Sequence, residues 1–341
     1  MKSRSTIALD LAKNVIHVHV ASDDGAVLAR LKLPRKRLLV YLAAQPRCTV
    51  VMEACSGAHN WARQIQRLGH DVRLIAPNYV KPFVKRQKND VADAEAICEA
   101  AQRPTMRFVA VKSEEQQASS LVFKIRDLIV RQRTQTINAL RGHLEEFGVI
   151  AGAGPQQLGR LIAKLDAPTQ TVPDYVREIC KILICTIDEQ STKIRALELE
   201  TSRRARRSPV AKRLMTIPGI SSITATALEA LAPPIETFSK GRDFAAWIGL
   251  TPRQHSTGGK PRLGKTSKMG QRDLRRLLVL GATAVVRWAR QRGAPSGSWL
   301  ARMLNKKPPK LIAVALANKM ARIVWVIMSK GEVYRASAPA I

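Results

Sequence analysis

The stretch TIALDLAKNVIHVHVASDDGAVLARLKL, residues 6–33, decides the fold of the N-terminal part of the chain. Apolar runs at 6–9, 15–20 and 26–33 each have the length of a strand, and the second run alternates apolar residues with histidines, as half-buried strands do. Asp23-Asp24-Gly25 separates the second run from the third with residues typical of a turn. These patterns predict three strands joined as a meander.

The pattern predicts two more strands and two helices after this meander. The strands are expected at residues 49–52 and 72–75, and the helices at 60–68 and from Asn89 or Asp90 to Gln102. A meander followed by strand–helix units is the order found in RNase H-like folds. We therefore expect an α/β domain of this class over residues 1–110.

Long helices are predicted from Ser113 onward. A Gly- and Ala-rich loop at residues 148–155 interrupts them, and a second long helix is expected at 174–207. The pattern predicts a helical hairpin or coiled-coil stalk over residues 111–207. Stalks of this kind usually pair protomers, although a bundle within one chain has the same periodicity. The apolar residues that recur at mostly three- and four-residue spacing are Leu121, Ile125, Leu128, Ile137, Leu140 and Leu144.

The third predicted region, residues 208–335, is mostly helical and basic. Apolar helices are expected at 277–290, 299–304 and 311–328. The chain carries 57 Lys plus Arg against 26 Asp plus Glu, a net charge of +31, and residues 201–276 alone hold 16 basic against 4 acidic residues. Such an excess predicts a polyanionic partner, most often nucleic acid. A ribosomal or nucleoid-packing protein is a weaker alternative, because 45% hydrophobic residues can form sizeable cores.

The sequence predicts a soluble, cytoplasmic protein associated with the nucleoid and without a membrane partner. Asp10 and Lys13 interrupt any apolar signal-peptide core, and the longest apolar run, residues 277–286, is shorter than the roughly 18 residues that span a bilayer. The cysteines are odd in number and lack C-x-x-C spacing, so we expect reduced core thiols. They are Cys48, Cys55, Cys98, Cys180 and Cys185.

Four carboxylates lie where predicted strands end or a helix begins. Asp10 and Glu53 end two strands, and Asp90 and Asp93 lie three residues apart at the start of a helix, so they share one face. Each alone could be a solvated surface acid. Together they would repel one another unless a divalent cation lay among them. Magnesium prefers oxygen ligands, and two such ions roughly 3.5 to 4 Å apart can promote phosphodiester cleavage.

Basic and turn residues near these elements are candidates for phosphate contacts. Lys85, Arg86 and Lys88 precede Asp90, although a solvated loop would have the same composition. Pro218 and Gly219, in the sequence Ile-Pro-Gly-Ile at 217–220, have the form of a helix-hairpin-helix turn, whose amides can hold a phosphate. A Pro-Gly turn is also an ordinary loop device.

Residues 249–276, GLTPRQHSTGGKPRLGKTSKMGQRDLRR, form the densest pattern. Residues 259–266 match the P-loop expression, but the polar segment before them and Gly270 soon after indicate an accidental match. A flexible Gly-rich loop remains, in which Ser256 or Thr257 could attack a phosphodiester. His255 could be the base or could contact phosphate. The surrounding cations, which we expect to bind nucleic acid, are Arg253, Lys260, Arg262, Lys265 and Lys268.

With these motifs the chain resembles, over nearly its whole length, the DEDD (RuvC-like) transposases of bacterial insertion sequences of the 110/1111 family, a group described as bridge-RNA-guided recombinases. The resemblance implies that Asp10, Glu53, Asp90 and Asp93 bind Mg²⁺, and that a serine near Ser-Thr-Gly-Gly forms a covalent link to DNA. It also implies a site shared between protomers of a dimer or tetramer, a Holliday-junction-like intermediate, and donor DNA, target DNA and a noncoding bridge RNA as partners.

Two positions depart from the family pattern. Asn89 stands where many relatives have Thr, and both residues cap helices well. The register places the nucleophile at Ser256 or, one residue on, at Thr257, and we favour Ser256. A RuvC-like structure-selective endonuclease without serine chemistry is the alternative function, and a non-enzymatic nucleic-acid binder is a second one.

Overall fold

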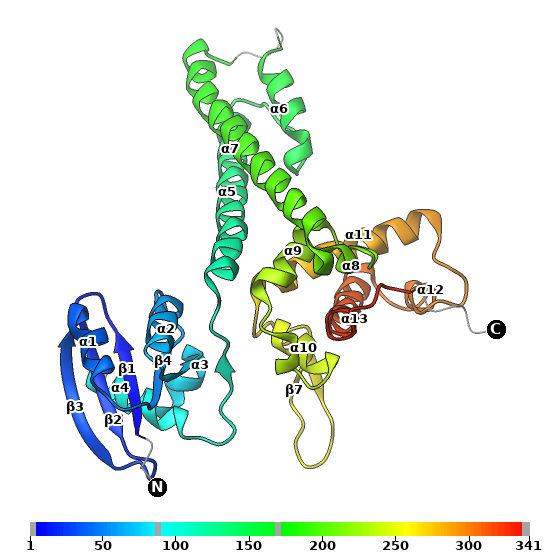
Figure 1. The fold of residues 1–341 in the computed structure, drawn as a ribbon. Coiled ribbons are helices and arrows are strands. Elements are labelled where there is room, and N and C mark those ends of the chain that lie inside the picture. Colours follow the sequence, from blue (N-terminus) through cyan, green and yellow to red (C-terminus); the bar gives the residue numbers. More distant parts are fainter. Residues whose placement is uncertain (1–4, 86–89, 168–171, 336–341) are drawn as a thin grey trace. The chain divides into compact units, whose positions relative to one another are not determined.

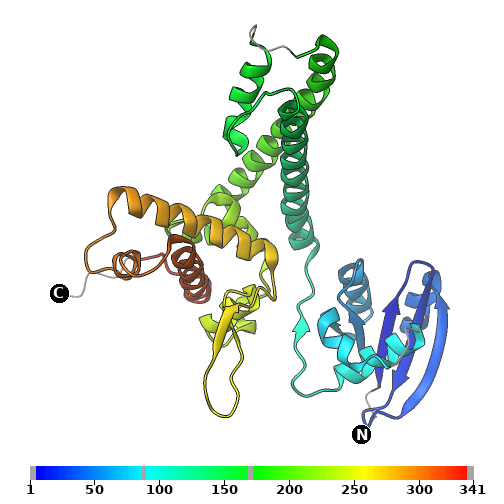
Figure 2. The ribbon, with the colours of Figure 1, turned by 180° about the vertical axis from the view of Figure 1, so that it is seen from behind.

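The computed structural model describes residues 5–85, 90–167 and 172–335, with the side chain of Asp90 excepted. The chain divides into two compact units, Met1–Glu115 and Gln116–Ile341, and each is described by itself (Figures 1 and 2). The division into three domains at residues 110 and 207 stays a prediction.

The first unit contains a six-stranded mixed sheet in the order β3-β2-β1-β4-β5-β6. β1, β2 and β3 form the predicted antiparallel meander, β1, β4 and β5 are parallel, and β6 is antiparallel at the edge. The α/β prediction is therefore confirmed. The strands are β1 (Thr6–Leu11), β2 (Val15–Ala21), β3 (Val27–Pro34), β4 (Thr49–Glu53), β5 (Asp71–Ile75) and β6 (Phe108–Val109).

Helices cover both faces of this sheet because side chains alternate along each strand. Leu9 of β1 packs in one core with α1 (Leu38–Ala43) and α2 (Ala58–Arg67). Ala8 lies in the opposite core with α3 (Pro77–Val80) and α4 (Asp90–Ala101). The small Ala8 side chain allows α4 to pack closely on this face. The short helix α1 was not predicted.

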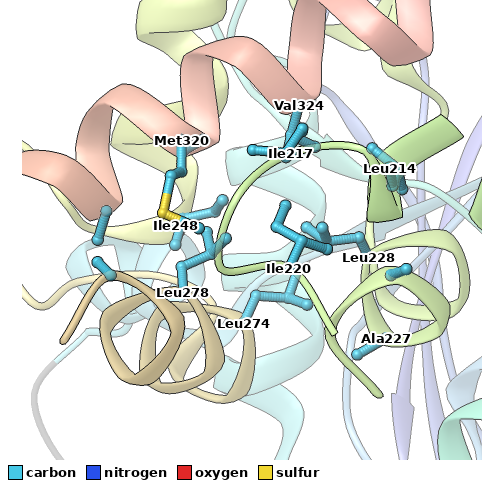
Figure 3. Packing of buried hydrophobic residues seen from close by; sticks show 14 of the residues in the cluster. Leu214, Ile217, Ile220, Ala227, Leu228, Ile248, Leu274, Leu278, Met320 and Val324 are labelled. Carbon is cyan, nitrogen blue, oxygen red and sulfur yellow. The ribbon is translucent and has the colours of Figure 1, made fainter. Parts of the chain in front are cut away.

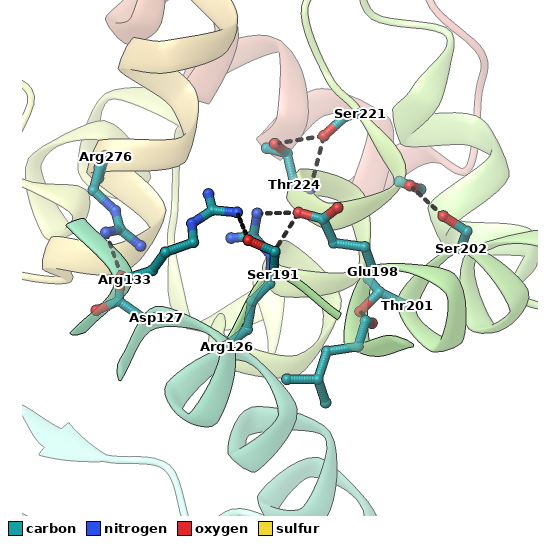
Figure 4. A network of polar contacts seen from close by, with 12 residues as sticks. Arg126, Asp127, Arg133, Ser191, Glu198, Thr201, Ser202, Ser221, Thr224 and Arg276 are labelled. Carbon is teal, nitrogen blue, oxygen red and sulfur yellow. Dashed lines mark hydrogen bonds and ion pairs between the residues drawn. The ribbon is translucent and has the colours of Figure 1, made fainter. Parts of the chain in front are cut away.

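The second unit begins with the predicted long helices, α5 (Glu114–Glu145) and α7 (Asp174–Arg207). α6 (Leu158–Leu165), which was not predicted, closes the end where Leu140, Leu161 and Cys180 share one buried cluster. Farther along the two helices, Arg133 of α5 hydrogen-bonds to Ser191 of α7, and Arg126 forms an ion pair with Glu198 (Figure 4). Ion pairs and core packing therefore hold the hairpin together within one chain.

The remaining helices pack around one core, in which Ile217 and Ile220 contact residues of several helices (Figure 3). The predicted helices at 277–290, 299–304 and 311–328 are confirmed, and the first and third of them are longer than predicted. The helix α10 was not predicted. These elements are α8 (Pro209–Met215), α9 (Ser222–Leu231), α10 (Gly241–Ile248), β7 (Pro252–Gln254), β8 (Leu263–Thr266), α11 (Arg272–Arg292), α12 (Trp299–Leu304) and α13 (Pro309–Lys330).

One helix of the described chain, α13, has the length and apolar composition that could cross a membrane. Its apolar residues serve the core instead: Ile312, Met320 and Val324 are buried, and the helix packs against α10 and α11. Lys319 and Arg322 are exposed in its middle. Core packing therefore accounts for the apolar composition of α13.

All five cysteines are free thiols. Cys48, Cys98 and Cys180 are buried, as expected of core thiols. Cys185 is exposed and Cys55 is half-buried, so the prediction is wrong for Cys185 and holds only in part for Cys55.

Candidate active site

The register of the sheet brings Asp10 and Glu53 together. β1 and β4 are parallel neighbours in which Leu9 pairs with Met52, so Asp10 and Glu53 are the next residues of the two strands. Residues two apart on a strand share a face. Both carboxylates therefore lie on the face of Ala8, which α4 covers.

Asp93 extends the buried stripe of α4 toward the N-terminus of that helix. Ala96, Ile97 and Ala100 pack against the sheet, and a residue three or four positions earlier lies on the same helix face. Asp93 is half-buried there. Asp90 is the first residue of α4, and its side chain lies outside the described part of the chain.

Electrostatics indicates that these carboxyl groups are near one another. The pKa of Glu53 is raised, first by burial and then by the negative charges of Asp10 and Asp93. Like charges held together in this way are stabilised by a cation. Among the described side chains, however, no three His, Cys, Asp or Glu groups are gathered closely enough to hold a metal ion by themselves.

Two histidines share this face, and sequence reasoning did not assign them to the site. His17 pairs with Asp10 and His19 pairs with Ala8 across β1 and β2. The pKa of His19 is lowered by burial and by the nearby Arg30. The alternation that predicted β2 also placed both histidines on one side, and the antiparallel pairing brings that side to Asp10.

The basic segment before α4 is partly engaged within the fold. Lys85 Nζ lies 2.5 Å from Glu95 Oε1, and Arg30 binds the other oxygen of Glu95 at 3.1 Å. Lys85 nevertheless stays 70% exposed. Arg86 and Lys88 lie outside the described residues. A phosphate contact by this segment stays a prediction.

The loop expected around Ser256 is a β-hairpin. β7 and β8 pair antiparallel, Thr257 bridges Lys260, and Gly258 and Gly259 both adopt positive φ between them. Two consecutive positive φ values favour glycine and match the twist of a hairpin. The prediction of a flexible Gly-rich loop is therefore wrong, because the Gly-Gly pair makes a tight turn.

Two donors fix the hydroxyl oxygen of Ser256. The side-chain amide of Gln254 donates to Oγ at 3.1 Å, and the backbone N–H of Arg262 donates to it at 3.0 Å. Neither contact uses the hydroxyl proton. Ser256 is exposed, so its oxygen is oriented at the surface of the hairpin with its proton available to an acceptor.

His255 points to the other side of the hairpin. Its ring lies against Gly264, where an added Cβ would come within 2.9 Å of the ring carbon Cδ2. The described hydrogen bonds to the Ser256 oxygen come from Gln254 and Arg262, whereas the His255 ring packs on Gly264. The geometry therefore does not support His255 as its base.

The five cations around the hairpin are exposed and form no ion pair within the described chain, which leaves them available to a polyanion. They are Arg253, Lys260, Arg262, Lys265 and Lys268. Lys265 and Thr266 of the P-loop expression belong to β8 and do not open a helix, which agrees with an accidental match.

Paired glycines anchor the base of the hairpin. A Cβ on Gly249 would lie 2.1 Å from the carbonyl oxygen of Met269, and one on Gly270 would lie 1.9 Å from that of Trp247. The two backbone segments therefore cross in direct contact next to α10. This crossing holds the hairpin on the core and leads directly into α11.

The predicted helix-hairpin-helix turn connects α8 and α9. Gly219 has a φ of +89°, and a Cβ there would lie 2.8 Å from the carbonyl oxygen of Gly281 on α11. Pro218 is exposed, and Ser221 caps α9 by accepting a hydrogen bond from the Thr224 amide. Packing against α11 therefore requires glycine at 219. Phosphate binding by Pro218 and Gly219 stays a prediction.

Two family models match the segments of the chain that contain these two groups of residues. Residues 7–149 match a family described as "Transposase" (DEDD_Tnp_IS110), and residues 211–295 match "Transposase IS116/IS110/IS902 family". The chain is 44% identical to "Probable family 20 transposase" of Pseudomonas aeruginosa, over 97% of this chain and 98% of the relative. The chain belongs to the IS110 family of transposases.

Other relatives are similar over almost the same length. "Transposase for insertion sequence element IS1328" of Yersinia enterocolitica is 39% identical over 98% of this chain and 99% of its own. "Transposase for insertion sequence element IS1111A" of Coxiella burnetii is 35% identical over 99% and 93%. This transposase is a DNA strand-transfer enzyme of an IS110-family insertion sequence, and its DEDD domain implies a divalent metal ion.

Proposed function

We propose that this transposase cleaves and rejoins DNA through two sets of residues. Asp10, Glu53, Asp90 and Asp93 would hold Mg²⁺, two ions when the site is full, and Ser256 would be the nucleophile. The observation that carries the proposal is the strand register that sets Asp10 beside Glu53 on the face covered by α4, which bears Asp93. Burial and the charges of Asp10 and Asp93 raise the pKa of Glu53 there, and such a carboxyl group gains from a bound cation.

The metal would lower the pKa of an attacking hydroxyl and neutralise charge on the phosphate. The chain's own residues supply the position of each reactant. α4 and the sheet edge hold the carboxylates on one face, and Gln254 with the Arg262 amide holds the oxygen of Ser256. Oγ would form a new bond to phosphorus while the sugar oxygen leaves, and the reverse step on a second strand would rejoin the DNA.

The stalk supports a dimer or tetramer in which one protomer's serine serves another's carboxylates. Tyr175, Ile179 and Ile182 of α7 follow four- and three-residue spacing and are 67%, 58% and 66% exposed. That spacing is typical of a coiled-coil seam. A second copy of the chain would cover it. A noncoding bridge RNA that pairs with donor and target DNA, and a Holliday-junction-like intermediate, complete the proposal.

The decisive experiment traps the covalent intermediate. Purified transposase, magnesium, the element's noncoding RNA and labelled donor and target DNA are mixed and separated on a denaturing gel. Wild type and Thr257→Ala should form a protein–DNA adduct and join strands, whereas Ser256→Ala and Asp10→Asn should do neither. Ser267→Ala, in the same block, and Asp71→Asn, an exposed acid of β5, serve as matched controls.

Each alternative gives a different pattern. An adduct that is lost in Thr257→Ala but retained in Ser256→Ala moves the nucleophile by one residue. Metal-dependent cleavage of branched DNA without any adduct indicates the structure-selective endonuclease. If strands are joined without the noncoding RNA, only the RNA-guide part of the proposal is contradicted, and the serine and carboxylate chemistry stands.

A further inference from the structure

An unusually basic segment follows the serine hairpin. Residues 274–331 contain 12 Lys plus Arg and no Asp or Glu. Two arginines of this unit have acidic partners: Arg126 of α5 binds Glu198, and Arg276, near the start of the basic segment, binds Asp127 of α5 (Figure 4). An acid for any other cation of this segment would likewise have to come from outside it, so the cations without such an ion pair can bind an anionic ligand.

A groove lies between α11 and the first turns of α13. Its volume is about 750 Å³. Apolar side chains and exposed cations both line it, so it combines a surface for a flat apolar group with positive charge for an anion. The lining residues that matter here are Val286, Ala313, Val314, Arg287, Arg290 and Lys310.

The three cations of this groove are not used by the fold. Arg287, Arg290 and Lys310 are exposed, and none forms an ion pair with a residue that the structure describes. Lys310 also lies in the first turn of α13, a helix of 22 residues whose N-terminal end adds partial positive charge. Beside the groove, Trp288 is 54% exposed with the Arg292 guanidinium 5.9 Å from its ring centre.

We propose that this groove binds an unpaired segment of a polynucleotide, with phosphates on the three cations and a base against the apolar lining. Three cations along one groove favour an occupant with several negative charges, and the apolar lining suits a base face that is not stacked in a duplex. Trp288 offers a neighbouring face for stacking. Arg287 is 15 residues along α11 from Arg272, or about 22 Å at 1.5 Å per residue. The groove is therefore separate from the serine hairpin.

Binding of fluorescent oligo(dT), oligo(rU) and a duplex is measured by anisotropy with the full-length protein in EDTA. Arg287→Ala/Arg290→Ala should weaken single-strand binding on the order of tenfold at about 0.1 M salt and reduce the salt slope by about 1.4, since each phosphate contact contributes about 0.7. The control Arg206→Ala/Arg242→Ala removes two exposed arginines on α7 and α10. Val314→Glu should weaken binding more than the neutral Val314→Gln.

A loss restricted to oligo(rU) or to oligo(dT) supports the proposal and identifies RNA or DNA as the occupant. A loss no larger than that of the control, an equal loss with duplex, or equal affinities of Val314→Glu and Val314→Gln would overturn it. The assay contains no metal and measures no cleavage. Its result is therefore independent of the Ser256 and carboxylate chemistry.

Discussion

Substitution of Gly281 by alanine tests the contact between the helix-hairpin-helix turn and α11. An added Cβ would lie 2.0 Å from the carbonyl oxygen of Gly219, where ordinary contacts are 3.4–4 Å. The three nearest atoms, the carbonyl oxygen, carbonyl carbon and Cα of Gly219, all belong to the backbone, so the turn or the helix must move by more than an ångström. Overpacking of this kind costs about 1–3 kcal/mol, and the better helix propensity of alanine returns about 0.5–1 kcal/mol. We expect a net loss of about 1 kcal/mol.

The assay is urea unfolding followed by tryptophan fluorescence, because Trp247, Trp288, Trp299 and Trp325 all lie in the second unit. Gly142→Ala is the matched control, since Gly142 lies in α5 with nothing within 4 Å of an added Cβ. That variant should gain up to about 1 kcal/mol. If Gly281→Ala were stabilised like Gly142→Ala, the close approach of the turn to α11 would be refuted.

Three further predictions concern single polar groups. Gln254→Ala should slow formation of the Ser256 adduct about fivefold, the value of one hydrogen bond of about 1 kcal/mol, with DNA affinity unchanged. A loss of DNA affinity with an unchanged rate of adduct formation would argue against this positioning role. Burial and two neighbouring charges raise the pKa of Glu53, so the folded state binds its proton more tightly and loses stability as pH rises from the unfolded value through the folded one. Glu53→Gln should therefore raise the melting temperature of metal-free protein at neutral pH and lose this advantage with magnesium, and an unchanged melting temperature would contradict the clustering. The buried His70 contacts the carbonyl of Leu42 at 3.0 Å, so His70→Ala should destabilise the first unit by about 1–3 kcal/mol in thermal unfolding, whereas a smaller effect would indicate that water replaces the ring.

The regular elements were predictable because their patterns are local. Alternation of apolar residues marked β2, and long runs of helical spacing marked α5 and α7, so their bounds agree within a few residues. The elements α10 and β7–β8 were missed. α10 has only eight residues, and the hairpin is exposed at all its strand positions except Thr266, Leu263 included. Periodicity cannot mark an element that buries almost nothing.

The sequence by itself determined which groups the site contains: carboxylates at strand ends and at a helix start, a serine among cations, and the basic charge. Only the tertiary structure decided how they are arranged. Strand register brought Asp10 beside Glu53 and His17, and the Gly-Gly turn placed the Arg262 amide on the oxygen of Ser256. The physical reason is that residue type and local period depend on neighbours along the chain, whereas register and backbone crossings depend on contacts between distant segments.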